Sequence, residues 1–262
     1  MEEVEILKRV AVGAGEILKS GFFGKKEVMH KGVVDLVTEY DKRAEDYILK
    51  ELSKEFRDFN LVAEESYSKD EFTSKKAIYI DPLDGTTNFV HNLPFFAVSI
   101  GLYREDGDNL AVVFNPILEE MFWAVEGVGA FRGDLKISVS TQSSFQSSLI
   151  ATGFPYAKAE AGKEYLWSVE SVKNILPKIQ DLRRFGAASL DLCYVADGRF
   201  EGFFEIGLKP WDIAGGALII KEAGGKVSKT DGKNYSFGDF DIVATNGLIH
   251  KNLVDSIKSW EE

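Results

Sequence analysis

The segment IDPLDGTTNF, Ile80 to Phe89, continues directly from the apolar run AIYI that begins at Ala77. A short apolar run of this composition predicts a buried strand. Asp81 and Asp84 stand at its end, so both carboxylates are expected to face one small volume. Two carboxylates about 4 Å apart repel by roughly 4 kcal/mol at an effective dielectric constant near 20, so a shared proton or a cation is expected between them.

An ordinary turn is the alternative, because Pro-x-Asp-Gly is good turn chemistry without any ligand. Two further acidic elements favour a cation site. Glu64 and Glu65 end the apolar run NLVA, and Asp212 opens a helical pattern after Pro210 and Trp211. Taken singly, these residues are typical of exposed glutamates after a strand and of a helix N-cap. Together with the DPLDGT segment they favour a cluster of carboxylates that holds a cation.

Oxygen ligands narrow the choice of cation. Carboxylates suit Mg²⁺, Mn²⁺ or Ca²⁺, whereas zinc normally recruits His or Cys. The three histidines, His30, His91 and His250, are dispersed. Next to the acidic residues, Gly85, Thr86 and Thr87 precede NFV, so free N–H groups of a helix N-terminus are expected to bind an anion such as phosphate. A metal cluster beside an anion site indicates phosphate-ester chemistry.

Composition bounds the remaining possibilities. A chain of 262 residues with 45% hydrophobic content can bury a sizeable core, as one domain or two packed lobes. Its net charge of -11 disfavours nucleic acid and anionic lipid as partners. The single Cys193 forms no internal disulfide, and the start MEEVEILKR lacks a signal pattern, so a cytoplasmic protein is expected. Apolar runs such as FFAVSIGLY are too short to span a membrane.

The order of patterns predicts two lobes. Helical spacing covers residues 7–18 and 44–56, with Thr38 and Asp41 as a possible capping box before the second helix. A polar loop, 66–76, comes before the DPLDGT strand, and the runs FFAVSIGLYR, NLAVVFNP and EMFWAVEG after it predict three antiparallel strands. The serine-rich stretch 138–148 marks a change of lobe. Beyond it, apolar runs alternate with helical patterns, which predicts an α/β lobe with a last helix that ends near Trp260.

Several of these segments together resemble the inositol monophosphatase family of Mg²⁺-dependent, lithium-sensitive phosphatases. The segments are DLVTEYD, AEES, IDPLDGTTNF and LKPWDIAGGALIIKEAGG, and the resemblance runs from about residue 5 to residue 257. It implies a homodimer and a layered αβαβα sandwich of the sugar-phosphatase type, of mixed α+β and α/β class. Residues 1–138 would form an antiparallel-rich metal- and phosphate-binding lobe, and residues 139–262 an α/β substrate-binding lobe.

Residue by residue, the resemblance implies two or three Mg²⁺ ions per site, with Mn²⁺ as a possible substitute. Glu64, Asp81 and the Leu83 carbonyl would bind the first ion. Asp81, Asp84 and Asp212 would bind the second, and Glu64 with waters a weaker third.

The resemblance also assigns the reaction. The Gly85 and Thr86 N–H groups would receive the phosphate. A water polarised by Glu64, and by the Thr86 hydroxyl that Asp41 holds, would attack phosphorus in line. Catalytic roles are thus implied for Glu64, Thr86 and Asp41.

Substrate contacts are implied for Glu205, the Ala188 backbone and Lys209. Lys209 departs from the animal enzymes, which have a histidine there, and a fixed positive charge could favour a second phosphate. Asp35 either supports the site or acts directly. The implied activity is hydrolysis of inositol 1-phosphate or a similar small polyol phosphate. Alternatives are fructose 1,6-bisphosphatase activity, alone or in addition, and a regulatory binding protein on the same fold.

Overall fold

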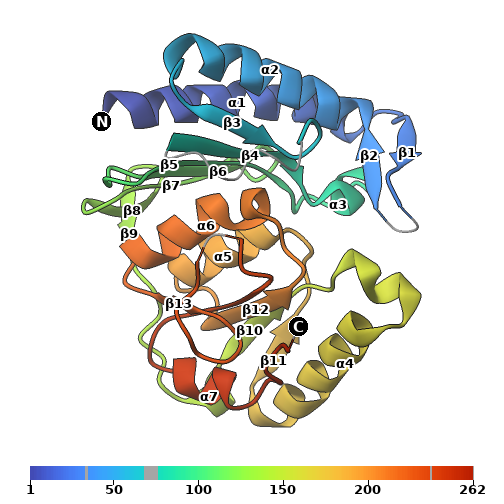
Figure 1. Cartoon of the computed structure of the whole chain (residues 1–262), viewed down its shortest axis with the longest axis vertical. Coiled ribbons are helices and arrows are strands. Elements are labelled where there is room, and N and C mark those ends of the chain that lie inside the picture. The colour runs from blue at the N-terminus through green and yellow to red at the C-terminus, as the bar shows by residue number, and fades with distance from the viewer. Residues whose placement is uncertain (33–34, 68–75, 237, 262) are drawn as a thin grey trace.

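The computed structural model describes residues 1–32, 35–67, 76–236 and 238–261. These residues form five layers in the order helix, sheet, helix, sheet, helix (Figure 1). The outer helices of the first layer are α1 (Glu2–Phe22) and α2 (Glu39–Glu55), the central helices are α5 (Ala188–Ala196) and α6 (Pro210–Glu222), and the last layer holds α4 (Lys163–Ile175) and α7 (His250–Val254). The predicted αβαβα architecture is confirmed.

A seven-stranded sheet forms the second layer, in the order β3-β4-β5-β6-β7-β8-β9. Its strands are β3 (Asn60–Ala63), β4 (Lys76–Asp84), β5 (Ala97–Arg104), β6 (Leu110–Asn115), β7 (Glu120–Val125), β8 (Gly129–Arg132) and β9 (Leu135–Ile137). Only the β3–β4 pair is parallel among these named strands. The three predicted antiparallel strands are β5, β6 and β7. Both faces are covered by helices, so most side chains of β4 to β6 are buried whichever way they point.

A five-stranded sheet forms the fourth layer, in the order β11-β10-β12-β14-β13. Its strands are β10 (Leu149–Thr152), β11 (Asp181–Arg183), β12 (Gly202–Ile206), β13 (Lys226–Ser228) and β14 (Asp241–Thr245). Strands β11, β10 and β12 run parallel, so their carboxyl ends lie at one edge. Ligands bind at such an edge in open α/β sheets. The serine-rich stretch connects the two sheets and contains the short 3₁₀ helix η1 (Phe145–Ser147).

Smaller elements complete the site edge. Strands β1 (Val28–His30) and β2 (Leu36–Thr38) pair into a two-stranded sheet, α3 (Thr86–Val90) follows β4, and the 3₁₀ helices η2 (Tyr156–Glu160) and η3 (Leu176–Lys178) flank α4. Most of the predicted polar loop, residues 68–75, lies outside the described residues. Within the described ranges, no helix has the length and apolar character to cross a bilayer.

One helix prediction was wrong. The last helix, α7, ends at Val254 and does not continue to Trp260. The chain turns after it because Ile257 packs into the outer core beside the five-stranded sheet, and the Trp260 N–H donates to Thr230 Oγ1 at 2.8 Å. A helical spacing of apolar residues is also produced by an irregular segment that covers a core.

Candidate active site

The carboxylates of DPLDGT lie where β4 leaves the regular sheet. Asp81 pairs with Ser99 of β5, and Asp84 pairs with Ala97, so β4 contains an irregularity between them. Such a bulge turns side chains out of their normal alternation. Asp81 Oδ1 accepts a hydrogen bond from the Leu83 N–H at 2.9 Å, which fixes the turn. Both aspartates are buried and line one cavity.

Two other elements bring their acidic residues to the same cavity. Glu64 follows β3, and its N–H donates to the Ile80 carbonyl of β4 at 3.1 Å. Asp212 lies in the first turn of α6, where its Oδ2 accepts from the Lys209 N–H at 2.7 Å. The cavity has a volume of about 910 Å³ and is lined by Glu64, Asp81, Leu83, Asp84 and Asp212 together. The residues predicted to form a cluster therefore share one space, although α6 begins at Pro210 and not at Asp212.

Burial raises the pKa of every member of this cluster, and repulsion inside the cluster adds to it for Asp81 and Asp212. The pKa of Asp81 and that of Asp212 lie well above the usual range, first because of burial and then because of Glu64 and Asp84. Burial raises the pKa of Asp84 to about 6 and that of Glu64 to about 7, against the opposing effect of Lys31 on Glu64. A group of carboxylates that resists ionisation in this way has the electrostatic environment of a cation site.

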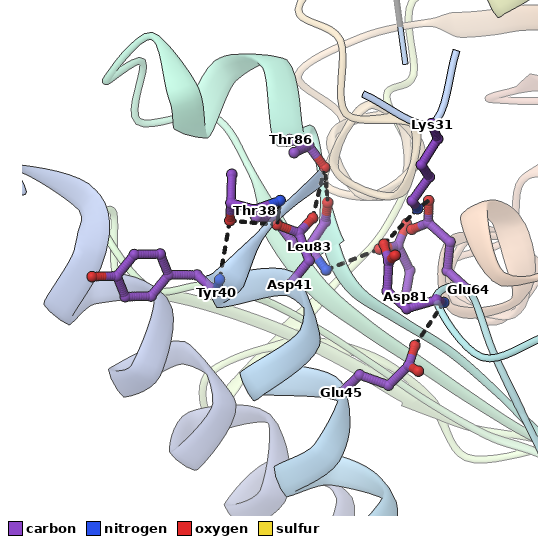
Figure 2. Close-up of polar contacts among 10 residues, drawn as sticks. Lys31, Thr38, Tyr40, Asp41, Glu45, Glu64, Asp81, Leu83 and Thr86 are labelled. Carbon is purple, nitrogen blue, oxygen red and sulfur yellow. Dashed lines mark hydrogen bonds and ion pairs between the residues drawn. The ribbon is translucent and has the colours of Figure 1, made fainter. Parts of the chain in front are cut away.

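The donor chemistry fits a hard divalent cation, because the convergent groups are carboxylates and one backbone carbonyl. As the side chains lie, no three Asp, Glu, His or Cys residues in the described part of the chain already surround a single point at ligand distance. One reason is that the Glu64 carboxylate is already paired with the Lys31 ammonium, whose Nζ lies 3.0 Å from Glu64 Oε1 (Figure 2). The same Nζ lies 2.5 Å from Glu65 Oε1. The lysine ammonium supplies positive charge to this side of the cluster.

A chain of hydrogen bonds connects α2 to the turn after β4 (Figure 2). The Thr86 hydroxyl lies 3.0 Å from Asp41 Oδ1 and 3.1 Å from the Leu83 carbonyl, the two acceptors to which it can donate. Asp41 Oδ2 accepts from the Thr38 N–H at 2.8 Å and the Thr38 hydroxyl at 2.6 Å. The predicted capping box is thus present, and its aspartate reaches Thr86 as well. With its proton donated in this way, the Thr86 oxygen can accept a hydrogen bond from a water.

Gly85 allows the turn that presents the next N–H groups. Its φ of 93° lies in the left-handed region, where a side chain would be strained. A Cβ there would also lie 3.1 Å from the Phe95 carbonyl and 3.2 Å from Ala187 Cβ. Gly85 is the N-cap of the short helix α3, and the first N–H groups of a helix have no acceptor within it. Gly85, Thr86 and Thr87 all line the cavity.

The same cavity holds the predicted substrate contacts. Glu205, on β12, is buried. Its carboxylate packs directly against Gly153, so that a Cβ added to this glycine would lie only 2.0 Å from Glu205 Oε2. Burial raises the pKa of Glu205 to about 8, although Arg184 and Lys158 oppose the rise. Ala188 and Lys209 also line the cavity, as does the half-buried Asp35. His250 lies elsewhere, hydrogen-bonded to Thr245 and Ser228.

Sequence reasoning missed three residues of the site, Ser189, Lys158 and Arg184, and it assigned no role to Lys31. Ser189 donates its N–H, at 2.7 Å, and its hydroxyl to Asp84 Oδ2. Lys31 contacts Glu64, and Lys158 and Arg184 line the cavity. Arg184 and Ser189 belong to the segment RRFGAAS that holds Ala188, and this was the signal available; nothing in the sequence marked Lys158.

Comparison of the sequence and the structure with known proteins identifies relatives of this chain. The family model described as "Inositol monophosphatase family" matches residues 1–261. The chain is 40% identical over 261 residues to inositol monophosphatase 3 of Solanum lycopersicum, covering 97% of this chain and 96% of the relative. It is 38% identical over 258 residues to the Nus factor SuhB of Escherichia coli K12, covering 97% and 95%. A crystal structure of extragenic suppressor protein SuhB from Bartonella henselae superposes with a TM-score of 0.91 at 37% identity, covering 98% and 99%.

Proposed function

The chain belongs to the inositol monophosphatase family and is a phosphatase, and from this premise we propose that it hydrolyses inositol 1-phosphate or a closely similar polyol phosphate in a Mg²⁺-dependent reaction. The products would be the free alcohol and inorganic phosphate. The observation that carries the proposal is the cluster of four carboxylates beside the Gly85–Thr86 turn, within one cavity, where Asp81 and Asp84 are buried and Glu64 and Asp212 are half-buried.

Glu64, Asp81, Asp84, Asp212 and the Leu83 carbonyl would hold two or three Mg²⁺ ions, for which Mn²⁺ could substitute. The family is in general metal-dependent. When bound, paired divalent cations lower the pKa of water and stabilise the charge of attacking and leaving oxygens in phosphoryl transfer. The raised pKa values of the carboxylates support this role, because a cation compensates the burial and the repulsion that cause them.

The remaining groups would orient the reactants. The Gly85 and Thr86 N–H groups would bind phosphate oxygens, as N–H groups at helix starts do. Thr86, with its hydroxyl donated towards Asp41, would accept a hydrogen bond from the attacking water, and Glu64 would take up its proton. Glu205, the Ala188 backbone and Lys209 would contact the polyol. A homodimer with lithium-sensitive activity, implied by the family resemblance, belongs to the same proposal.

The test is phosphate release from inositol 1-phosphate by the purified protein with Mg²⁺, with EDTA and with added lithium. We expect release that requires Mg²⁺ and falls with lithium. No release in Mg²⁺, from a folded protein, would refute the proposed function.

Two alternatives have a specific basis. Lys209 at the cavity favours a sugar bisphosphate, so fructose 1,6-bisphosphate is assayed alongside, and the ratio of kcat/KM values decides between the two activities. A regulatory role on the same fold is suggested by the name Nus factor SuhB of the Escherichia coli relative. An inactive protein that binds a transcription complex would support that role instead.

A further inference from the structure

The Lys31 ammonium lies against one of the carboxylates that the proposed function assigns to Mg²⁺ (Figure 2). Its Nζ lies 3.0 Å from Glu64 Oε1 and 2.5 Å from Glu65 Oε1, and its side chain lines the same cavity as Glu64. A metal ion on the Glu64 carboxylate would stand beside this ammonium, and two neighbouring positive charges repel each other. Lys31 and a cation therefore compete for Glu64.

Burial strengthens this competition. The Lys31 side chain is 28% exposed, and the side chains of its two partners are 20% exposed for Glu64 and 7% exposed for Glu65. Water screens an ion pair less in such a place than on an open surface. The pair between Lys54 and Glu51 on α2 provides a comparison, because its lysine is 53% exposed. The contact of Lys31 with Glu64 is thus expected to have a measurable effect on cation binding.

The second partner gives the ammonium a place to remain. Glu65 directly follows Glu64, and within the described ranges it is not among the residues that line the cavity. Its backbone is fixed by an N–H that donates to Glu45 Oε2 at 2.7 Å. When Glu64 turns to a cation, Lys31 can keep its contact with Glu65. Release of Glu64 then breaks one of the two ion pairs and leaves the other.

The backbone that carries Lys31 permits this exchange. Lys31 follows β1, whose three residues, Val28–His30, are all exposed and pair with β2 alone in a two-stranded sheet. The Lys31 N–H donates to the Asp35 carbonyl at 3.0 Å, which fixes the main chain of the connection. The ammonium itself is placed by a flexible four-carbon side chain and by its two ion pairs. It can therefore leave Glu64 without a change in the fold.

We propose that Lys31 is a built-in competitor of the divalent cation, which holds Glu64 in the metal-free protein and lowers the affinity of the site for Mg²⁺. The inference rests on the proposed function, which places Mg²⁺ at Glu64, and it deepens that function by naming a residue that regulates how readily the site is filled. The same contact supplies a positive charge to the carboxylate cluster while no metal ion is bound.

The test is titration of the metal-free protein with Mg²⁺ in a calorimeter at pH 8. Wild type is compared with Lys31→Met and Lys31→Gln, which remove the charge, and with Lys31→Arg, which preserves it. Lys209→Met removes another cation that lines the same cavity and measures the general effect of charge. Lys54→Met removes a lysine whose pair with Glu51 lies on the surface of α2. Thermal unfolding in EDTA verifies that each variant is folded and gives its metal-free Tm.

We expect the Kd for Mg²⁺ to fall at least about fivefold in Lys31→Met and Lys31→Gln, as loss of one competing ion pair provides. Lys31→Arg and Lys54→Met should stay within about twofold of wild type, and Lys209→Met should gain clearly less than Lys31→Met. The Mg²⁺ concentration for half-maximal phosphate release should fall together with the Kd. The metal-free Tm of Lys31→Met should be lower by about 2–4 °C, because Glu64 loses its positive partner.

An unchanged Kd in both uncharged Lys31 variants would overturn the inference, as would an equal gain in Lys209→Met. The same holds if Lys31→Arg binds Mg²⁺ as tightly as Lys31→Met, since the charge would then be irrelevant. Mg²⁺ binding of equal strength in wild type and variants refutes this inference alone. If neither wild type nor any variant binds Mg²⁺, the cation site of the proposed function is refuted and the inference falls with it.

Discussion

At the scale of single residues, Asp84 has two tasks that one substitution can separate. Its Oδ2 accepts two hydrogen bonds from Ser189, and its charge contributes to the proposed cation site. Asparagine keeps an acceptor oxygen and removes the charge. We expect Asp84→Asn to fold normally and to lose on the order of 100-fold or more in kcat. Turnover is measured at saturating Mg²⁺, and circular dichroism checks the fold.

Asp46→Asn is the matched control for this substitution. Asp46 is exposed on α2 and does not line the cavity. Its loss should leave turnover unchanged. A folded Asp84→Asn enzyme with wild-type activity would contradict the assignment of Asp84 to the cation site.

Glu205 provides a pH-dependent prediction. Its pKa is raised to about 8, so the carboxyl group is mostly protonated at pH 7 and mostly ionised at pH 9. An ionised carboxylate accepts stronger hydrogen bonds from substrate hydroxyls. We therefore expect the KM to fall as pH rises towards this pKa, with a midpoint at or below 8, because bound cations favour the ionised form. In Glu205→Gln this change should disappear while Mg²⁺ affinity stays within about twofold; a lost Mg²⁺ affinity would assign Glu205 to the metal instead.

Sequence reasoning could identify the carboxylates because each follows an apolar run or opens a helical pattern, and both are local features of the sequence. Ser189 could not be found this way, since it reaches Asp84 across 105 positions of sequence. Lys158 and Arg184 were missed for a related reason. They line a cavity that only the tertiary fold assembles.

At the scale of elements, the spacing of apolar residues was sufficient to predict a helix or strand where that element covers a core with a regular face. Helix α1 is an example, with apolar residues at helical spacing, whereas strands β5 and β6 were recognised as short continuous apolar runs because both faces of their sheet are covered. The last helix was mispredicted because Ile257 and Trp260 pack without helical backbone. The irregularity between Asp81 and Asp84 was also beyond sequence reasoning, since a bulge depends on the pairing of β4 with β5.

The N-terminus of α2 connects stability to the site. Thr38 caps the helix by accepting the Tyr40 N–H at 3.1 Å, and its hydroxyl also holds Asp41. Thr38→Ala should cost about 1 kcal/mol and lower the Tm by about 2–4 °C. Burial raises the pKa of Asp41 to about 6 against the hydrogen bonds from Thr38. Losing the hydroxyl should raise this pKa further, so the acid limb of the pH–rate profile should move to higher pH.

Ser53→Ala is the control for this effect. Ser53 lies near the other end of α2, where its exposed hydroxyl donates to the Lys50 carbonyl. We expect neither its Tm nor its pH profile to change noticeably. If Thr38→Ala lowered the Tm but left the acid limb in place, the proposed coupling of Asp41 to Thr86 would be wrong.

At the scale of the whole molecule, the layers place charge where it opposes folding. Strand β4 brings two carboxylates into one cavity, and the end of β3 and helix α6 bring one each, in a chain whose net charge is already -11. Carboxylates with a pKa above the unfolded value stabilise the fold when protonated, and that contribution is lost as pH rises through the folded pKa. For Asp84 and Glu64 this occurs at about 6 and about 7.

The Tm of the metal-free protein should therefore rise as pH is lowered from 8 to 6, and Mg²⁺ should stabilise it at pH 8. Mg²⁺ at 100 times its Kd contributes about 2.7 kcal/mol.

Asp212→Asn keeps an acceptor for the Lys209 N–H and removes one repelling charge. We expect it to raise the metal-free Tm at pH 8 by about 2–4 °C per kcal/mol of repulsion relieved, and to reduce the Mg²⁺-induced shift. Scanning calorimetry in EDTA and in Mg²⁺ measures both, with Asp46→Asn as control. A lower metal-free Tm in Asp212→Asn would show that the cluster does not oppose folding, and the electrostatic argument for a cation there would fail.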